Sequence, residues 1–162
     1  MTLAIADTDI LSTFGKLGRV DLLRKLFPTI YVPPAVYREL GMAERLGFPW
    51  AGTVRGAVEL LPLIKDEVEE VEHIAVSYPQ LGSGEIETLV LASTHHLLCL
   101  TNDRQAKAVC RILNRAYLDL EDLLRTFKIR GILTIAALKQ LIEQIEEKDR
   151  TLIKAKDQIL KE

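Results

Sequence analysis

The sequence predicts an α/β fold, namely a three-layer α/β/α domain with a mostly parallel central sheet and a helical C-terminal tail. Short apolar runs alternate with stretches whose apolar residues recur at helical spacing, a pattern typical of βαβ units. The 162 residues match the usual size of one domain. Because no repeat, Ser/Gly linker or low-complexity tract divides the chain, one domain is the simplest interpretation.

The first half of the chain predicts two buried strands, each followed by helix. Apolar residues recur at helical spacing after each strand, and prolines mark where helices end and begin. From residue 47 to residue 62 glycines and prolines interrupt any period, which predicts a loop-rich excursion in which residues 59–64 could form a peripheral strand. The elements expected here are a strand at 3–6, helices through 17 and at 20–27, a strand at 29–32 and a helix from 33 to about 46.

The second half continues the alternation and ends in an amphipathic tail. The elements expected are helices at 66–77 and from 85, a strand at 97–101, a helix at 104–113, a short strand at 116–118 and a helix at 120–127. After Gly131 the pattern is helical to the end of the chain, in one or two pieces. We therefore divide the chain into a main domain at residues 1–130 and a helical extension at residues 131–162, which packs on the same domain or on a partner.

Composition limits the classes of function. Hydrophobic residues make up 48% and charged residues 27%, as in an ordinary soluble globular protein. No apolar run approaches the roughly 20 residues that span a bilayer, and the N-terminus lacks signal-peptide features, so we expect no membrane association and a cytoplasmic location. Cys99 and Cys110 are expected to be buried thiols. The formal net charge of −2 counts mildly against a generic nucleic-acid-binding module.

Four acidic residues lie where an α/β sheet places its chemistry. Asp7 and Asp103 follow strands, Glu85 begins a helix, and Glu39 lies in the helix after the Pro33–Pro34 pair. Taken singly, each has an ordinary role as a helix cap, a partner of a helix dipole or a solvated surface carboxylate. Together they would repel one another unless a multivalent cation neutralised them, and oxygen-only ligands select Mg²⁺ or Mn²⁺.

The four acids belong to four short motifs, which appear in order along the chain. They are IADTDIL at 5–11, VPPAVYREL at 32–40, LGSGEIETLVLA at 81–92 and LLCLTNDRQA at 97–106. Together they resemble the motifs of the PIN-domain ribonucleases, which include the VapC-type toxins. In the third motif Glu85 matches the family's spacing, whereas Glu87 points to a nearly opposite side of the helix and is held in reserve.

The resemblance implies a parallel sheet with flanking helices and Mg²⁺- or Mn²⁺-dependent cleavage of RNA. It implies Asp7, Glu39, Glu85 and Asp103 as metal ligands, and Thr101 as a hydroxyl that orients water or a ligand. It also implies a homodimer and, in many members, a cognate antitoxin protein. Asp9 stands where the family more often has Ser, Thr or Asn, so this extra carboxylate either shifts the metal preference or stays outside the site.

A basic stripe follows the fourth motif. Arg104, Lys107 and Arg111 lie on the helix after Asp103 and could contact the phosphates of a nucleic acid. The alternative, a solvated helix face, is at least as common for such a pattern.

Our leading hypothesis is a metal-dependent endoribonuclease, which could be the toxin of a toxin-antitoxin pair. One alternative is a non-catalytic binding or regulatory module with the same fold and acidic pocket. Another is an aspartate-nucleophile phosphatase, because Asp7-Thr8-Asp9 is similar to the start of that class. We rank the phosphatase lower because Leu11 stands where that class usually has threonine.

Overall fold

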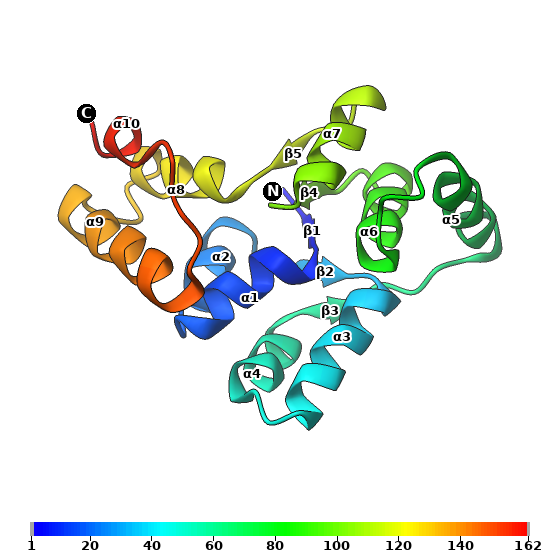
Figure 1. Ribbon diagram of the computed structural model, residues 1–162, viewed down its shortest axis with the longest axis horizontal. Coiled ribbons are helices and arrows are strands. Elements are labelled where there is room, and N and C mark those ends of the chain that lie inside the picture. The colour runs from blue at the N-terminus through cyan, green and yellow to red at the C-terminus, as the bar shows by residue number, and fades with distance from the viewer. Residues whose placement is uncertain (1, 162) are drawn as a thin grey trace.

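One sheet of five strands, all parallel, organises the computed structural model, which describes residues 2–161 (Figure 1). The strands are β1 (Ala4–Ala6), β2 (Ile30–Val32), β3 (Glu59–Leu60), β4 (Leu98–Leu100) and β5 (Tyr117–Leu118). Their order across the sheet is β3-β2-β1-β4-β5, so β1 lies at the centre. Ala4 pairs with Ile30 on one side and with Leu98 on the other. The predicted parallel sheet is confirmed.

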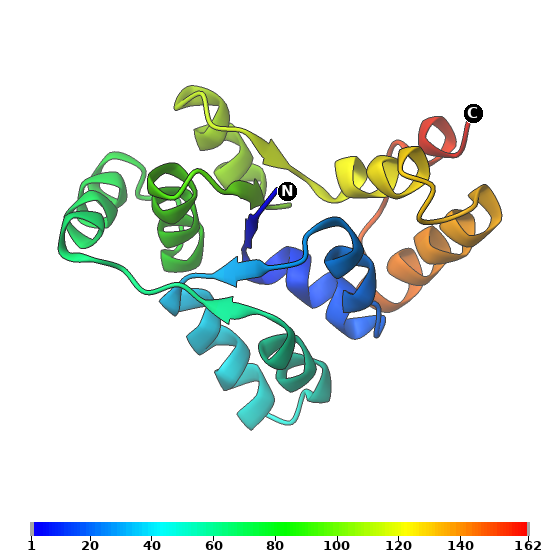
Figure 2. The same cartoon turned by 180° about the vertical axis from the view of Figure 1, so that it is seen from behind.

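Helices cover both faces of this sheet (Figures 1 and 2). They are α1 (Thr8–Lys16), α2 (Val20–Leu26), α3 (Pro34–Arg45), α4 (Pro49–Ala57), α5 (Lys65–Ser77), α6 (Ser83–Thr94), α7 (Arg104–Ile112), α8 (Leu120–Ile129), α9 (Ile135–Gln144), the π-helix η1 (Ile145–Asp149) and α10 (Lys156–Leu160). None of the helices in residues 2–161 has the length and hydrophobicity that a bilayer crossing requires.

The central strand shows how the three layers are built. Successive side chains of a strand point to opposite faces. Ala4 and Ala6 pack in one cluster of buried residues with α1, α2, α8 and α9, whereas Ile5 packs in a second cluster with α5, α6 and α7. Cys99 and Cys110 lie in the second cluster as buried free thiols, as predicted. The predicted three-layer α/β/α architecture is confirmed.

The loop-rich excursion predicted after α3 is wrong, because most of that segment is α4. Pro49 stands in the first turn of α4, where its missing N–H needs no partner. One of the glycines in this segment, Gly52, and Gly15 in α1 stand where helices approach each other closely. A Cβ at Gly52 would lie 2.9 Å from Cδ of Glu44 in α3, and one at Gly15 in α1 would lie 2.7 Å from Cγ2 of Val54. The peripheral strand is present as β3.

The chain after α8 packs against α1 and α8. Leu138, Ile142, Ile153 and Ile159 are buried in the same cluster as the first two helices. The tail is helical in two pieces, one of the two forms that the sequence predicted, because Arg150 takes a left-handed conformation with φ of 57° and ends η1. Residues 151–155 then run without regular helical structure to α10.

Asp149 ties this C-terminal segment to α1. Its carboxylate, 8% exposed, accepts hydrogen bonds from Thr13 Oγ1 at 2.8 Å and from Lys16 Nζ at 3.0 Å. We expect Asp149→Ala to lower the free energy of unfolding by about 2 kcal/mol, because the charged acceptor of a buried hydroxyl is lost. Urea unfolding measures the change. Asp157→Ala, at an exposed position in α10, is the control and should have little effect; equal effects of the two variants would contradict the prediction.

Candidate active site

Asp7 lies at the centre of the carboxyl edge of the sheet, between β1 and α1. Only 2% of the residue is exposed. Its Oδ1 accepts a hydrogen bond from the Ile10 backbone N–H at 3.3 Å, so it caps α1, and its Oδ2 accepts one from the Thr101 hydroxyl. Burial raises the pKa of Asp7 to about 7, and the negative charges of Asp9 and Glu85 add to the rise. Without a bound cation, Asp7 therefore holds a proton at a much higher pH than an exposed aspartate does.

Thr101 and Asp103 come from the neighbouring strand. The pairing of β1 with β4 aligns Ala6 with Leu100, which places Asp7 beside Thr101. Thr101 is 1% exposed. Its hydroxyl donates a hydrogen bond to Asp7 and accepts one from the Asp103 backbone N–H at 3.2 Å. The Asp103 carboxylate caps α7 by accepting from the Ala106 N–H at 2.7 Å. The two capping roles foreseen for Asp7 and Asp103 therefore coexist with their position at one edge.

Glu39 reaches the same edge from α3. The Thr8 hydroxyl, at the start of α1, donates a hydrogen bond to Glu39 Oε2. A Cβ at Gly84 would lie 3.2 Å from Glu39 Oε1, so the carboxylate lies against the first turn of α6. This role of Thr8 is not predicted from the sequence. Its only signal was a polar residue directly after Asp7, which is equally typical of a helix start.

Glu85 lies in the first turn of α6, where the negative charges of the other acids act on its carboxylate. A Cβ at Gly82 would collide with the Glu85 carboxylate, so the glycine leaves room for it. Burial raises the pKa of Glu85, and the charges of Asp103, Glu39 and Asp9 raise it further. The pKa of Asp9 is likewise raised, first by desolvation and then by Asp103 and Glu39. Asp9 therefore belongs to the electrostatic environment of the other acids.

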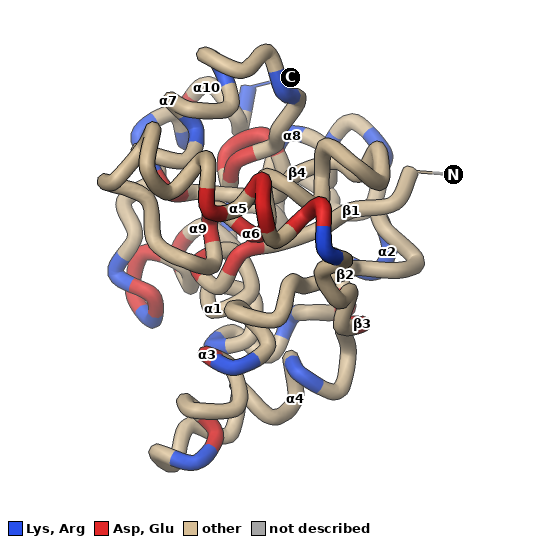
Figure 3. Tube along the Cα trace, turned by 90° about the vertical axis from the view of Figure 1, so that its right-hand side faces the viewer, with Lys and Arg blue, Asp and Glu red and all other residues tan. Residues whose placement is uncertain are grey.

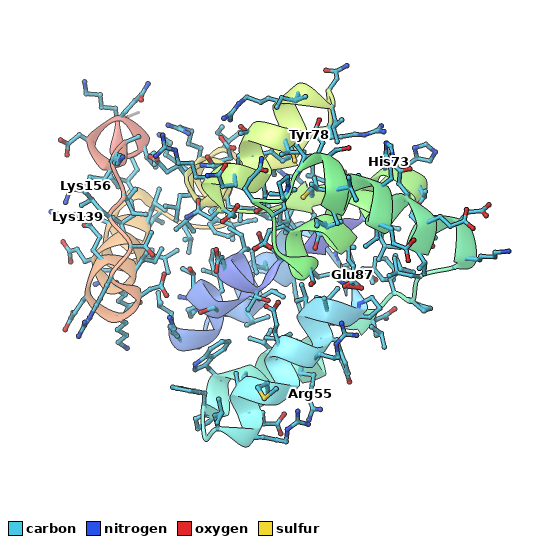
Figure 4. The ribbon with its side chains drawn as sticks, turned by 45° about the vertical axis from the view of Figure 1, so that its right-hand side comes forward. Arg55, His73, Tyr78, Glu87, Lys139 and Lys156 are labelled. Atoms are coloured by element: carbon cyan, nitrogen blue, oxygen red, sulfur yellow. The ribbon has the colours of Figure 1, made fainter. Side chains whose placement is uncertain are left out.

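Glu87, the reserve candidate, has a different position. It is 5% exposed, and its Oε2 accepts a hydrogen bond at 3.1 Å from the backbone N–H of Ala35 in the first turn of α3. Figure 4 shows Glu87 where α6 faces the start of α3. Burial raises its pKa, and the nearby Arg38 charge lowers it. Glu87 thus joins two helices, which favours Glu85 as the acid that faces the site.

A hard divalent cation fits the chemistry of these donors. Asp7, Glu39, Glu85 and Asp103 offer only carboxylate oxygens, which Mg²⁺ and Mn²⁺ prefer. Within residues 2–161, no three acidic, histidine or cysteine side chains are close enough to enclose an ion by themselves. An ion that uses one or two carboxylates, waters and substrate oxygens needs no such enclosure. Asp7, Glu39 and Asp103 are also each oriented by a hydroxyl or backbone donor.

The predicted basic stripe on α7 is divided between internal and exposed roles. Lys107 Nζ forms an ion pair with Asp119 at 3.2 Å. Arg111 Nη1 donates to the Tyr117 hydroxyl at 2.7 Å. Both contacts help to hold β5 and the start of α8 against α7. Arg104, one residue after Asp103, is exposed.

A cavity of about 510 Å³ opens beside Glu39. Arg38, Met42 and Phe48 contribute to its walls, together with Ser83 at the start of α6. Met42 and Phe48 are about half exposed, at 54% and 51%. An aromatic side chain next to acids and an arginine can hold a flat, partly apolar group such as a nucleobase.

The fold and the site together define a three-layer α/β/α domain with acids at the carboxyl edge of its parallel sheet. A family model described as a PIN domain matches residues 3–161, and the chain belongs to the PIN-domain family. Among solved structures, the chain is similar in fold to PAE2754 from Pyrobaculum aerophilum, with a TM-score of 0.57 and 19% identity over 89% of this chain and 100% of that chain. No curated protein matches. The predicted family resemblance is confirmed.

Proposed function

We propose that this protein is a metal-dependent endoribonuclease that uses Mg²⁺ or Mn²⁺, with Asp7, Glu39, Glu85 and Asp103 as the metal ligands, one or two for each ion. The observation that carries the proposal is the placement of the acids, because the side chain of Asp7 is hydrogen-bonded to Thr101 after β4, and Thr8, the next residue after Asp7, is hydrogen-bonded to Glu39 from α3. Asp7 is buried, and its pKa of about 7 reflects both that burial and the charges of Asp9 and Glu85. A cation at this edge would make full ionisation favourable. PIN-domain membership supports a nuclease as the class of protein.

Each polar group at the edge has a role in this hydrolysis. The metal would lower the pKa of water and balance the charge that develops on the phosphate oxygens. Thr101 orients Asp7, and Thr8 orients Glu39. In the reaction the oxygen of a water molecule bonds to phosphorus and that water loses a proton. The P–O bond to one sugar breaks, and the departing oxygen takes up a proton, which leaves a phosphomonoester and a hydroxyl.

Several finer expectations accompany the enzyme proposal. A role as the toxin of a toxin-antitoxin pair, an antitoxin partner and a homodimer are supported by the family resemblance. A cytoplasmic location remains the expectation drawn from the sequence. The nucleic-acid contact of Arg104 is supported by its exposure beside Asp103. The contacts proposed for Lys107 and Arg111 compete with their internal partners Asp119 and Tyr117.

A Mn²⁺ titration of the full chain tests the proposed function directly. Binding is followed by calorimetry, and cleavage is followed with a labelled single-stranded RNA at each metal concentration. The ribonuclease predicts that cleavage rises with metal occupancy. Metal binding without cleavage of any RNA would favour the non-catalytic module. A covalent phosphate on Asp7 after acid quench with a phosphomonoester would favour the phosphatase.

Glu85 and Glu87 can be separated by matched amide variants. Glu85→Gln should reduce cleavage by about 100-fold or more, since loss of a ligand costs at least as much as loss of the group that supports one. Glu87→Gln should leave cleavage unchanged, because an amide oxygen can still accept the Ala35 N–H. Initial cleavage rates at saturating Mn²⁺ measure the difference. A large loss in Glu87→Gln with full activity in Glu85→Gln would assign the third acid to Glu87.

A further inference from the structure

A second cavity adjoins the acidic edge on the side of the C-terminal segment. It has a volume of about 230 Å³ and lies between the start of α7 and the stretch that links η1 to α10. Asn102, Arg104 and Lys107 line it from one side, and Thr151 and Lys154 line it from the other. Because Asn102 and Arg104 are the chain neighbours of Asp103, the cavity begins next to a proposed metal ligand.

The walls of this cavity are basic. Within residues 2–161, neither Arg104 nor Lys154 has an ion-pair partner, and both are exposed. The acid in the wall, Glu121, accepts a hydrogen bond from the Ala155 N–H at 2.9 Å. Figure 3 shows acidic positions around α5 and α6 and at the start of α8, whereas basic positions mark the chain near α7 and α10. An anion next to the acidic edge would therefore meet positive charge here.

The location of Arg104 has no explanation in helix stability. Arg104 is the first residue of α7, where the helix dipole disfavours a positive charge by about 0.3–1 kcal/mol. Asn102 adds a neutral donor, since its Oδ1 accepts from the Leu120 N–H at 3.3 Å and leaves its amide group available. An arginine fork, a lysine and an amide are together suited to phosphate oxygens.

We propose that this cavity binds a backbone phosphate of the nucleic acid next to the one that is cut. The C-terminal segment would then complete the substrate groove through Lys154, in addition to packing on α1 and α8. The proposal rests on the proposed function for the identity of the ligand. Its test measures RNA binding in the absence of cleavage, so that the phosphate site and the ribonuclease function can be disproved separately.

The first measurement is the affinity of the metal-free full chain for single-stranded RNA in the presence of a chelator. The double variant Arg104→Ala/Lys154→Ala should raise the dissociation constant about tenfold. A plot of the logarithm of the association constant against the logarithm of the salt concentration should become shallower by about 0.7, the value for one phosphate contact. The control Arg130→Ala/Lys139→Ala removes one arginine and one lysine from exposed positions outside the cavity. Figure 4 shows Lys139 on α9, at the outer edge of the molecule.

The second measurement locates the phosphate. A series of RNAs carries one neutral methylphosphonate linkage at successive positions. The wild type should lose affinity at one position, and the double variant should be indifferent to that position because the contact is already absent. Thermal melting should show both variants folded, since the replaced side chains are exposed.

The outcomes separate the two proposals. Equal losses in the double variant and the control, or no single sensitive position in the methylphosphonate series, would overturn the phosphate site. If the wild type cleaves no RNA with Mn²⁺ but the position-specific loss remains, the phosphate site holds and the ribonuclease proposal fails.

Discussion

Replacing Asp7 with asparagine should end RNA cleavage and, at the same time, stabilise the metal-free protein above neutral pH. Asparagine keeps one oxygen, which can accept the Ile10 N–H, and its amide group can donate a hydrogen bond to the Thr101 oxygen in place of accepting one. The substitution also removes a buried negative charge. We expect cleavage to fall by about 100-fold or more, because a neutral amide is a poor ligand for a hard cation. A gain in stability is expected if Asp7 serves function, whereas a loss is expected if Asp7 serves mainly to stabilise the fold.

The sign of the stability change follows from the pKa of Asp7. Its folded value of about 7 lies above the ordinary 3.8, so the folded state binds more protons than the unfolded state between these values. The contribution of Asp7 to the stability of the wild type is therefore fully present below pH 3.8 and is lost as pH rises through about 7. The full effect is at most about 4 kcal/mol. Asp7→Asn should recover about half of it, roughly 2 kcal/mol, because an amide still costs something to bury.

Urea unfolding of the metal-free protein at about pH 5 and about pH 8 measures this linkage. The variant and the wild type should differ most at the higher pH. Asp157→Asn, at an exposed position, should show no such pH-dependent gain. Saturating Mn²⁺ should stabilise the wild type and not Asp7→Asn, since a ligand that binds only the folded state raises its stability. If Asp7→Asn is less stable than the wild type at both pH values, Asp7 acts mainly as the cap of α1.

The sequence was sufficient to predict the features that depend on local patterns. Short apolar runs marked β1 and β4, and the acids that follow them lie where parallel strands place such residues. Proline before α3 marked the helix that carries Glu39. These signals are local because burial of a strand and the start of a helix are decided by a few adjacent residues.

The features that escaped prediction depend on contacts between distant parts of the chain. Thr8 and Glu39 are 31 residues apart, and Thr13 and Asp149 are 136 apart, so no local pattern reveals that they are paired. The helix α4 was missed for a related reason. A glycine such as Gly52 lowers helix propensity, and the packing of α4 against α3 and α1 compensates for it.

Thr101→Val should weaken metal-dependent cleavage and shift its pH dependence upward. Valine has nearly the shape of threonine, so the buried position stays filled, but Asp7 loses a hydrogen bond that lowers its pKa. The pKa of Asp7 should rise further, and the acidic limb of the cleavage profile should move to higher pH, since the ionised carboxylate is the form that binds a cation. The Asp103 N–H also loses its acceptor. At neutral pH we expect about 10- to 100-fold less cleavage, as for the loss of a group that supports a ligand.

Cleavage rates and Mn²⁺ affinity measured across pH distinguish an orienting hydroxyl from simple packing. An orienting role predicts that Thr101→Val regains part of its activity as pH rises, because more Asp7 becomes ionised. Thr101→Ser keeps the hydroxyl and should restore the wild-type profile despite the missing methyl group. If the valine variant instead loses the same factor at every pH and serine does not rescue it, the methyl and hydroxyl of Thr101 serve only to fill the space beneath the acids. The ionisation of Asp7 would then be set by burial and by the charges of Asp9 and Glu85 alone.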